Sequence, residues 1–259
     1  MSLLYRLDAS DIATMWADTG KTTQITDGTG VATWSPKAGA VTTDAVQATS
    51  LNRPTYRSSY SSTGYPAVEF DGSNDFMTIA HSSGWDNTTA YEIVAVVHLP
   101  VAAGSGVFRV ILQKTNTTGW TNGLHFVHFQ GLISGGSPAY NQNTMSEIIG
   151  ERLLVYLRSS TTAGGQGNIG RTSWPFTWTR TNLTGNTTPT TNTEAVRLGS
   201  GYTSGFHFSG AIHELRVYSG GETSGDIAAV WADMANRWGI LTTGGGGFRP
   251  VNIRGGADQ

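Results

Sequence analysis

The residues of this chain that could form an acid–base pair are its glutamates. Glycoside hydrolysis needs two carboxyl groups roughly 5 to 10 Å apart. The glutamates are scattered along the sequence, and the closest two are Glu147 and Glu151, separated by two isoleucines and a glycine. We interpret this segment as a solvated turn before a strand. The chain also lacks cysteine and a Gly-x-Ser-x-Gly motif between a strand and a helix. The sequence therefore predicts a protein that is not an enzyme.

A calcium site is the one cofactor that the residue types allow. Asp71, Asn74 and Asp75 place hard oxygen atoms close together in the chain, and Ca²⁺ takes about six to eight oxygen ligands. The alternative is that Asp71 and Asn74 bind the backbone of their own turn, as Asp and Asn often do. The sequence leaves both interpretations open.

Aromatic side chains are the candidates for binding a sugar. Trp174, Phe176 and Trp178 alternate, so on a strand they would share one face, and Pro175 favours a sheet edge. Such a row could stack on sugar rings or fill the core of the fold. Trp120 lies in a Gly/Thr/Asn-rich segment that predicts an exposed hairpin tip. The carbohydrate-binding candidates are therefore Trp120, Trp174 and Trp178.

The C-terminal segment has a composition unusual for a disordered end. After the glycine run 244–247, apolar residues alternate with arginines. An extended peptide of this kind can add to a sheet edge or a groove of a neighbouring protein, although a frayed terminus is the plain alternative. We predict a folded domain over 1–243 and a linker with a docking tail over 244–259. The candidate docking residues are Phe248, Arg249, Val251, Asn252, Ile253 and Arg254.

Composition limits the remaining classes of function. Charged residues make up 13% of the chain, the net charge is −2, and no basic block occurs, which argues against nucleic-acid binding. Apolar residues at 38% suffice for a packed core. No run reaches the roughly 20 apolar residues that span a bilayer, and the N-terminus does not resemble a secretory leader. We expect synthesis in a cytoplasm without membrane insertion.

Short strands dominate the expected secondary structure. Residues 91–99 are almost continuously apolar, as in a strand buried on both faces. Asp71-Gly72 lies between two strand-like runs, 66–70 and 76–79, and predicts a hairpin. Two helices are expected. One is a short turn capped by Ser10, and the other carries an amphipathic pattern that ends at Gly239. The further expected strands are 107–113, 123–129, 152–157, 195–198 and 206–218.

Two segments resemble laminin G-like domains, a family with the concanavalin A-like jelly-roll fold. Residues 66–76, PAVEFDGSNDF, resemble the early strand pair of that family, and residues 209–218, SGAIHELRVY, resemble its late strand. The opening Leu7-Asp8-Ala9-Ser10-Asp11 and the closing Arg237-Trp238-Gly239 fit versions found in bacterial and phage proteins. The resemblance implies an all-β sandwich with a short N-terminal helix and one C-terminal amphipathic helix. It also implies that some relatives bind calcium at loop carboxylates.

The sequence departs from this family at His213, where an Asp is usual. On a regular strand His213 would share a face with Leu215 and Val217, and Glu214 and Arg216 would share the other.

The resemblance, together with the Gly/Thr/Ser-rich composition, implies a structural protein of a phage particle. The expected function is a virion surface protein, a capsid decoration or a tail or fibre appendage. Its tail would bind a capsid or tail protein, and a homo-oligomer is compatible with this role. The alternative is a lectin-like module that binds a surface glycan of a host.

Overall fold

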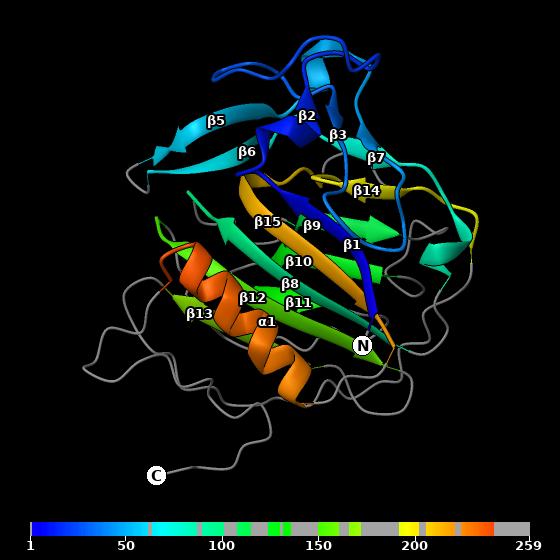
Figure 1. Cartoon of the computed structure of the whole chain (residues 1–259), viewed down its shortest axis with the longest axis vertical. Helices are drawn as coiled ribbons and strands as arrows, with labels where there is room; N and C mark the ends of the chain where they lie inside the picture. The colour runs from blue at the N-terminus through cyan, green and yellow to red at the C-terminus, as the bar shows by residue number, and fades with distance from the viewer. Residues whose placement is uncertain are drawn as a thin grey trace.

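Two antiparallel sheets lie face to face in the computed structural model, and one helix lies on the outside of the first sheet (Figure 1). The structure describes residues 2–61, 64–86, 90–100, 108–114, 124–129, 132–135, 150–160, 166–171, 192–201, 206–220 and 224–240. The arrangement confirms the predicted β-sandwich with one helix near the C-terminus. In the described part of the chain, no helix has the length and apolar character needed to cross a membrane.

The first sheet, sheet A, has 7 strands in the order β13-β12-β8-β15-β6-β5, and β1 also pairs with β15. The second half of β15 pairs with β1, and its first half pairs with β6 on the same edge. These strands are β1 (Ser2–Asp8), β5 (Thr55–Tyr60), β6 (Tyr65–Asp71), β8 (Ala90–His98), β12 (Arg152–Ser160), β13 (Gln166–Arg171) and β15 (Ser209–Ser219).

The second sheet, sheet B, has 8 strands in the order β11-β10-β9-β14-β7-β4-β3-β2. They are β2 (Met15–Trp16), β3 (Thr33–Trp34), β4 (Ala45–Val46), β7 (Met77–Ile79), β9 (Phe108–Lys114), β10 (Leu124–Phe129), β11 (Leu132–Gly135) and β14 (Val196–Leu198). Short 3-10 turns occur at Ile12–Thr14, Ser50–Asn52 and Ser83–Trp85.

Strand β8 contributes apolar side chains both to the core between the sheets and to a cluster on the outer face of sheet A. Ile93 and Val97 point inward and join the core between the sheets, whereas Val94 and Val96 point outward into a second apolar cluster. A strand that is buried on both faces needs apolar side chains at nearly every position, which explains the continuous pattern that the sequence shows there.

Helix α1 (Ser224–Arg237) covers the outer face of sheet A over β12 and β8 (Figure 1). Met234 and Trp238 are buried in the outer cluster with Val94, Val96 and Leu154. Their i, i+4 spacing places them on one face of the helix, which confirms the predicted amphipathic helix.

The helix ends in a Schellman motif. The amide of Gly239 donates to the carbonyl of Asn236, and the amide of Ile240 donates to that of Ala235. Gly239 has φ +58, a left-handed conformation that favours glycine. The predicted stop at Gly239 therefore has its expected geometry.

The predicted hairpin at residues 66–79 is wrong. Strand β6 pairs with β5 and β15 in sheet A, whereas β7 pairs with β4 and β14 in sheet B. The Asp71–Asp75 turn carries the chain from one sheet to the other. A Gly-containing turn determines only that the chain changes direction there. Which strands pair with the two flanking strands depends on distant parts of the sequence.

The predicted first helix is reduced to the single 3-10 turn Ile12–Thr14. Ser10 does not cap it. Instead the Ser10 amide and hydroxyl both donate to Asp8 Oδ1, at 3.0 and 2.6 Å. Met15 and Trp16, expected on the helix, form β2.

The predicted orientation of His213 is also wrong. Ile212 pairs with Val97 and Glu214 pairs with Val96, so His213 is an extra residue in β15, a β-bulge. The bulge places His213 on the outer face of sheet A, where its ring lies 5.3 Å from that of Trp238. Leu215 and Val217 still point into the core.

Candidate functional site

Tertiary structure brings together a carboxylate pair that the sequence pattern does not reveal. Asp8 at the end of β1 lies opposite Glu214 on β15, and cross-strand neighbours have Cβ atoms about 5 Å apart. That separation is within the range for two catalytic carboxyl groups. Both residues have 0% exposure. Their surroundings decide what they can do.

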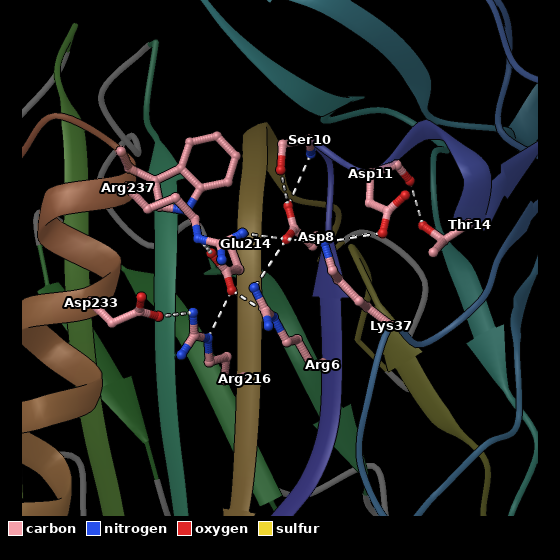
Figure 2. A network of polar contacts seen from close by, with 11 residues as sticks. Arg6, Asp8, Ser10, Asp11, Thr14, Lys37, Glu214, Arg216, Asp233 and Arg237 are labelled. Atoms are coloured by element: carbon pink, nitrogen blue, oxygen red, sulfur yellow. Dashed lines mark hydrogen bonds and ion pairs between the residues drawn. The ribbon is translucent and has the colours of Figure 1, made fainter.

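Asp8 is surrounded by donors and cations (Figure 2). Oδ1 accepts from Ser10, and Oδ2 accepts from Arg6 at 3.0 Å and from Arg237 at 2.7 Å, with Lys37 Nζ 3.3 Å away. Burial alone would raise the pKa of Asp8, but the hydrogen bonds of Ser10 and the charges of Lys37 and Arg6 hold it below the usual value. Asp8 is therefore ionised at neutral pH.

Glu214 binds three elements of the fold at once. Its Oε1 accepts from Arg6 Nε at 2.8 Å and from Arg216 Nε at 2.7 Å, and its Oε2 accepts from Trp238 Nε1 at 2.6 Å. Arg216 also binds Asp233 of α1 (Figure 2). The network thus ties the first strand, the late strand and the helix together.

The charges of this network balance. Arg6, Lys37, Arg216 and Arg237 carry four positive charges, and Asp8, Asp11, Glu214 and Asp233 carry four negative charges. A general acid must hold a proton and reach its substrate. Asp8 is ionised, both carboxylates are fully buried, and their oxygens are occupied by cations, by Ser10 and by the indole of Trp238. This pair positions α1 and β1 on sheet A and is not arranged for acid–base chemistry.

The predicted calcium residues lie at the rim where β6 leaves sheet A. Asp71 Oδ1 accepts from the amides of Ser73, Asn74 and Asp75, at 2.7 to 3.3 Å, so this oxygen holds its own turn. Asp75 Oδ2 accepts from the Asp71 amide. Burial, with the charge of Asp71, raises the pKa of Asp75 to about 6. Among the described residues, no group of three or more His, Asp or Glu is placed to hold a metal.

The outer face of sheet B carries a row of side chains in register. Met15, Trp34, Ala45, Ile79 and Leu198 point into the core, so the alternate residues of the same strands point outward. Successive strand pairings place these outward residues side by side across the sheet: Trp16, Thr33, Val46, Thr78, Arg197 and Gln113.

Two aromatic rings on this face have a cation over them. Lys21 Nζ lies 5.2 Å from the centroid of the Trp16 ring, and Arg197 Cζ lies 6.0 Å from that of Phe76. We call Trp16, Val46, Phe76, Thr78 and Arg197 the outer patch; each of them is partly exposed.

The sequence contained a signal for part of this patch. Phe76 and Thr78 alternate with Met77 and Ile79, and this period of two predicts opposite faces. It could not show that Trp16 and Arg197 lie on the same face, because they come from distant segments.

Other predicted binding residues lie outside the described part of the chain. These are the tryptophans Trp120, Trp174 and Trp178 and the tail residues Phe248, Arg249, Val251, Asn252, Ile253 and Arg254. Their assignments stay predictions, as do the domain boundary near 243 and a homo-oligomeric state.

Comparison with known proteins gives no family by sequence. No family model matches the chain, and no curated protein matches it.

Solved structures are similar in fold at low identity. Trypanosoma rangeli sialidase in complex with sialic acid matches with a TM-score of 0.56 and 13% identity, over 91% of this chain and 33% of the sialidase. Domain 4 of AbnA, a GH43 extracellular arabinanase from Geobacillus stearothermophilus, in complex with arabinotriose, matches with a TM-score of 0.50 and 13% identity, over 86% of this chain and 94% of that domain. The binding domain of Paraclostridial Mosquitocidal Protein 1 matches with a TM-score of 0.51 and 8% identity, over 93% of this chain and 55% of that domain.

The chain spans about one third of the length of the sialidase that it matches. At these identities the likeness concerns the fold, and function has to be argued from residues. The chain is a two-sheet β-sandwich of the type that these structures share.

Proposed function

We propose that the chain is a non-catalytic carbohydrate-binding module that uses the outer patch. The observation that carries this proposal is the pairing of partly exposed rings with cations on the outer face of sheet B. An aromatic ring can stack on the apolar face of a sugar, and a guanidinium can donate hydrogen bonds to hydroxyl or carboxylate groups. Lys21 is paired with Asp44, so Arg197, which also donates to the Gly201 carbonyl, is the group that would favour glycans carrying a carboxylate.

The fold comparison supports this proposal. The arabinanase domain, a structure in complex with arabinotriose, is matched over 94% of its length. The buried Asp8–Glu214 pair, held by cations, supports a role in binding rather than in hydrolysis.

Replacing Phe76 or Arg197 by alanine is expected to weaken glycan binding about ten-fold, because losing one stacking or charged contact costs about 1.4 kcal/mol. The measurement is calorimetric titration with the best ligand from a screen of neutral and acidic oligosaccharides, run with and without Ca²⁺. Arg57→Ala is the matched control, since Arg57 is a partly exposed arginine of sheet A that binds Glu69. Its affinity should equal that of the unmodified protein.

Other outcomes of the same titration separate the candidate surfaces. If Trp120→Ala weakens binding and the outer-patch variants do not, the ligand binds at the predicted hairpin tip. A Ca²⁺ requirement that Asp75→Asn removes would place the ligand at the turn after β6. Failure of the unmodified protein to bind any glycan would refute the binding proposal altogether.

We propose a second role in assembly, as a surface protein of a phage particle whose tail binds a capsid or tail protein. It rests on the alternating tail sequence, Phe248 to Arg254, and on the Schellman motif that closes α1 at Ile240. The two roles are compatible, since a surface protein can bind both its particle and a glycan.

A chain that ends at Thr243 is expected to keep the melting temperature of the full chain, because the described apolar clusters extend no further than Ile240. It should lose the capture of structural proteins from a lysate of the native source. Pull-down with both chains, read by mass spectrometry, measures this. Equal capture by both would contradict a docking role for the tail.

A further inference from the structure

Two buried histidines lie beneath the C-terminal end of α1. His213, in the bulge of β15, has 0% exposure, and His98, the last residue of β8, has 2%. The ring of His213 lies 5.3 Å from that of Trp238, which follows α1 directly. The ring of Tyr60, at the end of β5, makes edge contacts with both histidines, at 5.1 and 6.2 Å.

The hydrogen bonds of His213 define its proton. Nδ1 lies 2.7 Å from the carbonyl oxygen of Pro66, which can only accept, so Nδ1 carries the hydrogen and Nε2 is the free base. Nε2 is buried without a hydrogen-bond partner, and so is Nδ1 of His98. Each histidine therefore has one buried ring nitrogen without a hydrogen-bond partner, and on His213 this nitrogen carries no hydrogen.

Among the described residues, the groups that face these histidines offer no free negative charge. Arg152 of β12 lies over the ring of Tyr65 at 3.9 Å, and its charge acts on both histidines. Glu214, the neighbour of His213 in the chain, is occupied by Arg6, Arg216 and Trp238.

The other described groups around the two histidines include no carboxylate. They are the rings of Tyr60 and Tyr65 and the indole of Trp238. On the helix, Arg237 and Asp233 bind Asp8 and Arg216. A proton added to His98 or His213 would therefore lie near the Arg152 cation with no free carboxylate among the described residues to pair with it.

We propose that His98 and His213 form an acid-sensitive latch that holds the C-terminal end of α1 on sheet A while they are neutral and releases it when they are protonated. Trp238 is the part that must move. It covers His213, it ends the helix, and it is fixed to the sheet by one hydrogen bond to Glu214 and by packing in the outer cluster. Water can reach His213 when Trp238 lifts.

The direction of the pH dependence follows from the histidine pKa values. Burial, with the charge of Arg152, lowers the pKa of His213 to about 3, and it also lowers that of His98. A released histidine titrates near 6.5. The released state therefore binds more protons between about pH 6.5 and 3, so the docked state loses stability as the pH falls through that window. At pH 5 the population of the released state should be roughly thirty-fold higher from His213 alone.

Hydrogen exchange of single amides tests this latch. The amides of Trp238 and Ile240 bind the carbonyls of Met234 and Ala235. Their protection factors should fall about thirty-fold between pH 7.5 and 5, and at both pH values they should stay below those of Val94 to Val97 in β8, because release of α1 opens less of the fold than global unfolding does. Protection at Trp238 and Ile240 that does not change with pH, or that equals the protection of β8 at both pH values, would overturn the proposal even with the unmodified protein alone.

Matched variants assign the effect to the two histidines. His213→Asn keeps a donor for the Pro66 carbonyl and His98→Phe keeps a ring against Tyr60, so the double variant removes both titrations with small changes in packing. It should lose the pH dependence of Trp238 and Ile240. His81→Asn, at a partly exposed histidine near Asp86, should retain it. An unchanged pH dependence in the double variant would refute the latch.

One carboxyl group outside the latch opposes its effect on global stability. Asp75 has a pKa raised to about 6, so its contribution to stability is present at acid pH and is lost as the pH rises from about 3.8 to 6. Because Asp75 is unchanged in all the variants, its contribution cancels in the comparison between them.

Discussion

Replacing Glu214 by alanine is expected to lower the free energy of unfolding by about 3 to 5 kcal/mol, the usual cost of removing one partner from a buried ion pair. Glu214 has 0% exposure and binds Arg6, Arg216 and the indole of Trp238. Without Glu214, Asp8 would be the only fully buried carboxylate left in this network to balance the guanidinium groups of Arg6 and Arg216. Urea unfolding, followed by tryptophan fluorescence, measures the change.

The loss of stability should appear first as opening of α1, because Trp238 and Arg216 connect Glu214 to the helix. Asp11→Ala is the control. Asp11 binds Lys37 at 3.0 Å in the same network, but it is partly exposed, and an exposed ion pair contributes about 1 kcal/mol or less. If Glu214→Ala and Asp11→Ala lower the free energy of unfolding equally, burial does not determine how much an ion pair of this network contributes. The proposal that Glu214 holds α1 on sheet A would then be wrong.

Replacing Gly199 by alanine is expected to cost about 2 to 4 kcal/mol, from crowding of the core and from strain in the backbone. Gly199 follows β14 with φ +82, and a Cβ there would lie 2.3 Å from ring atoms of Phe70. The Phe70 ring is buried between the sheets and packs against Phe208 at 5.9 Å. It has no room to move without displacing the core. Urea unfolding of the variant measures the change.

Gly28→Ala separates the cost of backbone strain from the cost of crowding the core. Gly28 has a similar φ, +75, but a Cβ there would meet nothing within 4 Å, so it should cost only the backbone strain, about 1 kcal/mol. In a Phe70→Ala background, Gly199→Ala should cost no more than Gly28→Ala, because the clash is gone. Equal costs for the two glycines in the unmodified chain would show that Phe70 does not limit this position.

The parts of the fold that the sequence predicts are those whose signal is local. The apolar run of residues 91–99 becomes β8, and the i, i+3/4 pattern before Trp238 becomes α1 with its stop at Gly239. Burial on one face, or on both, leaves a period in the sequence that can be read without knowing the partner. The layered all-β architecture follows from many such short segments.

The tertiary structure decided which strands pair with one another and on which face of a sheet a side chain lies. Asp71-Gly72 predicts a turn correctly, but only contacts with β4 and β14 place β7 in the other sheet. One extra residue in β15 moves His213 from the core face to the outer face, because a shift of one residue reverses the side of a strand. No local pattern records such an insertion.

The candidate sites follow the same division. Asp8 and Glu214 come from opposite ends of the chain, and Trp16 and Arg197 share the outer patch only through four intervening strand pairings. The amino-acid sequence determined which segments are strands and which helix covers them, since these depend on neighbours in the chain. Tertiary structure alone decided which charged and aromatic side chains meet, because each such contact joins residues whose separation in the sequence carries no periodic signal.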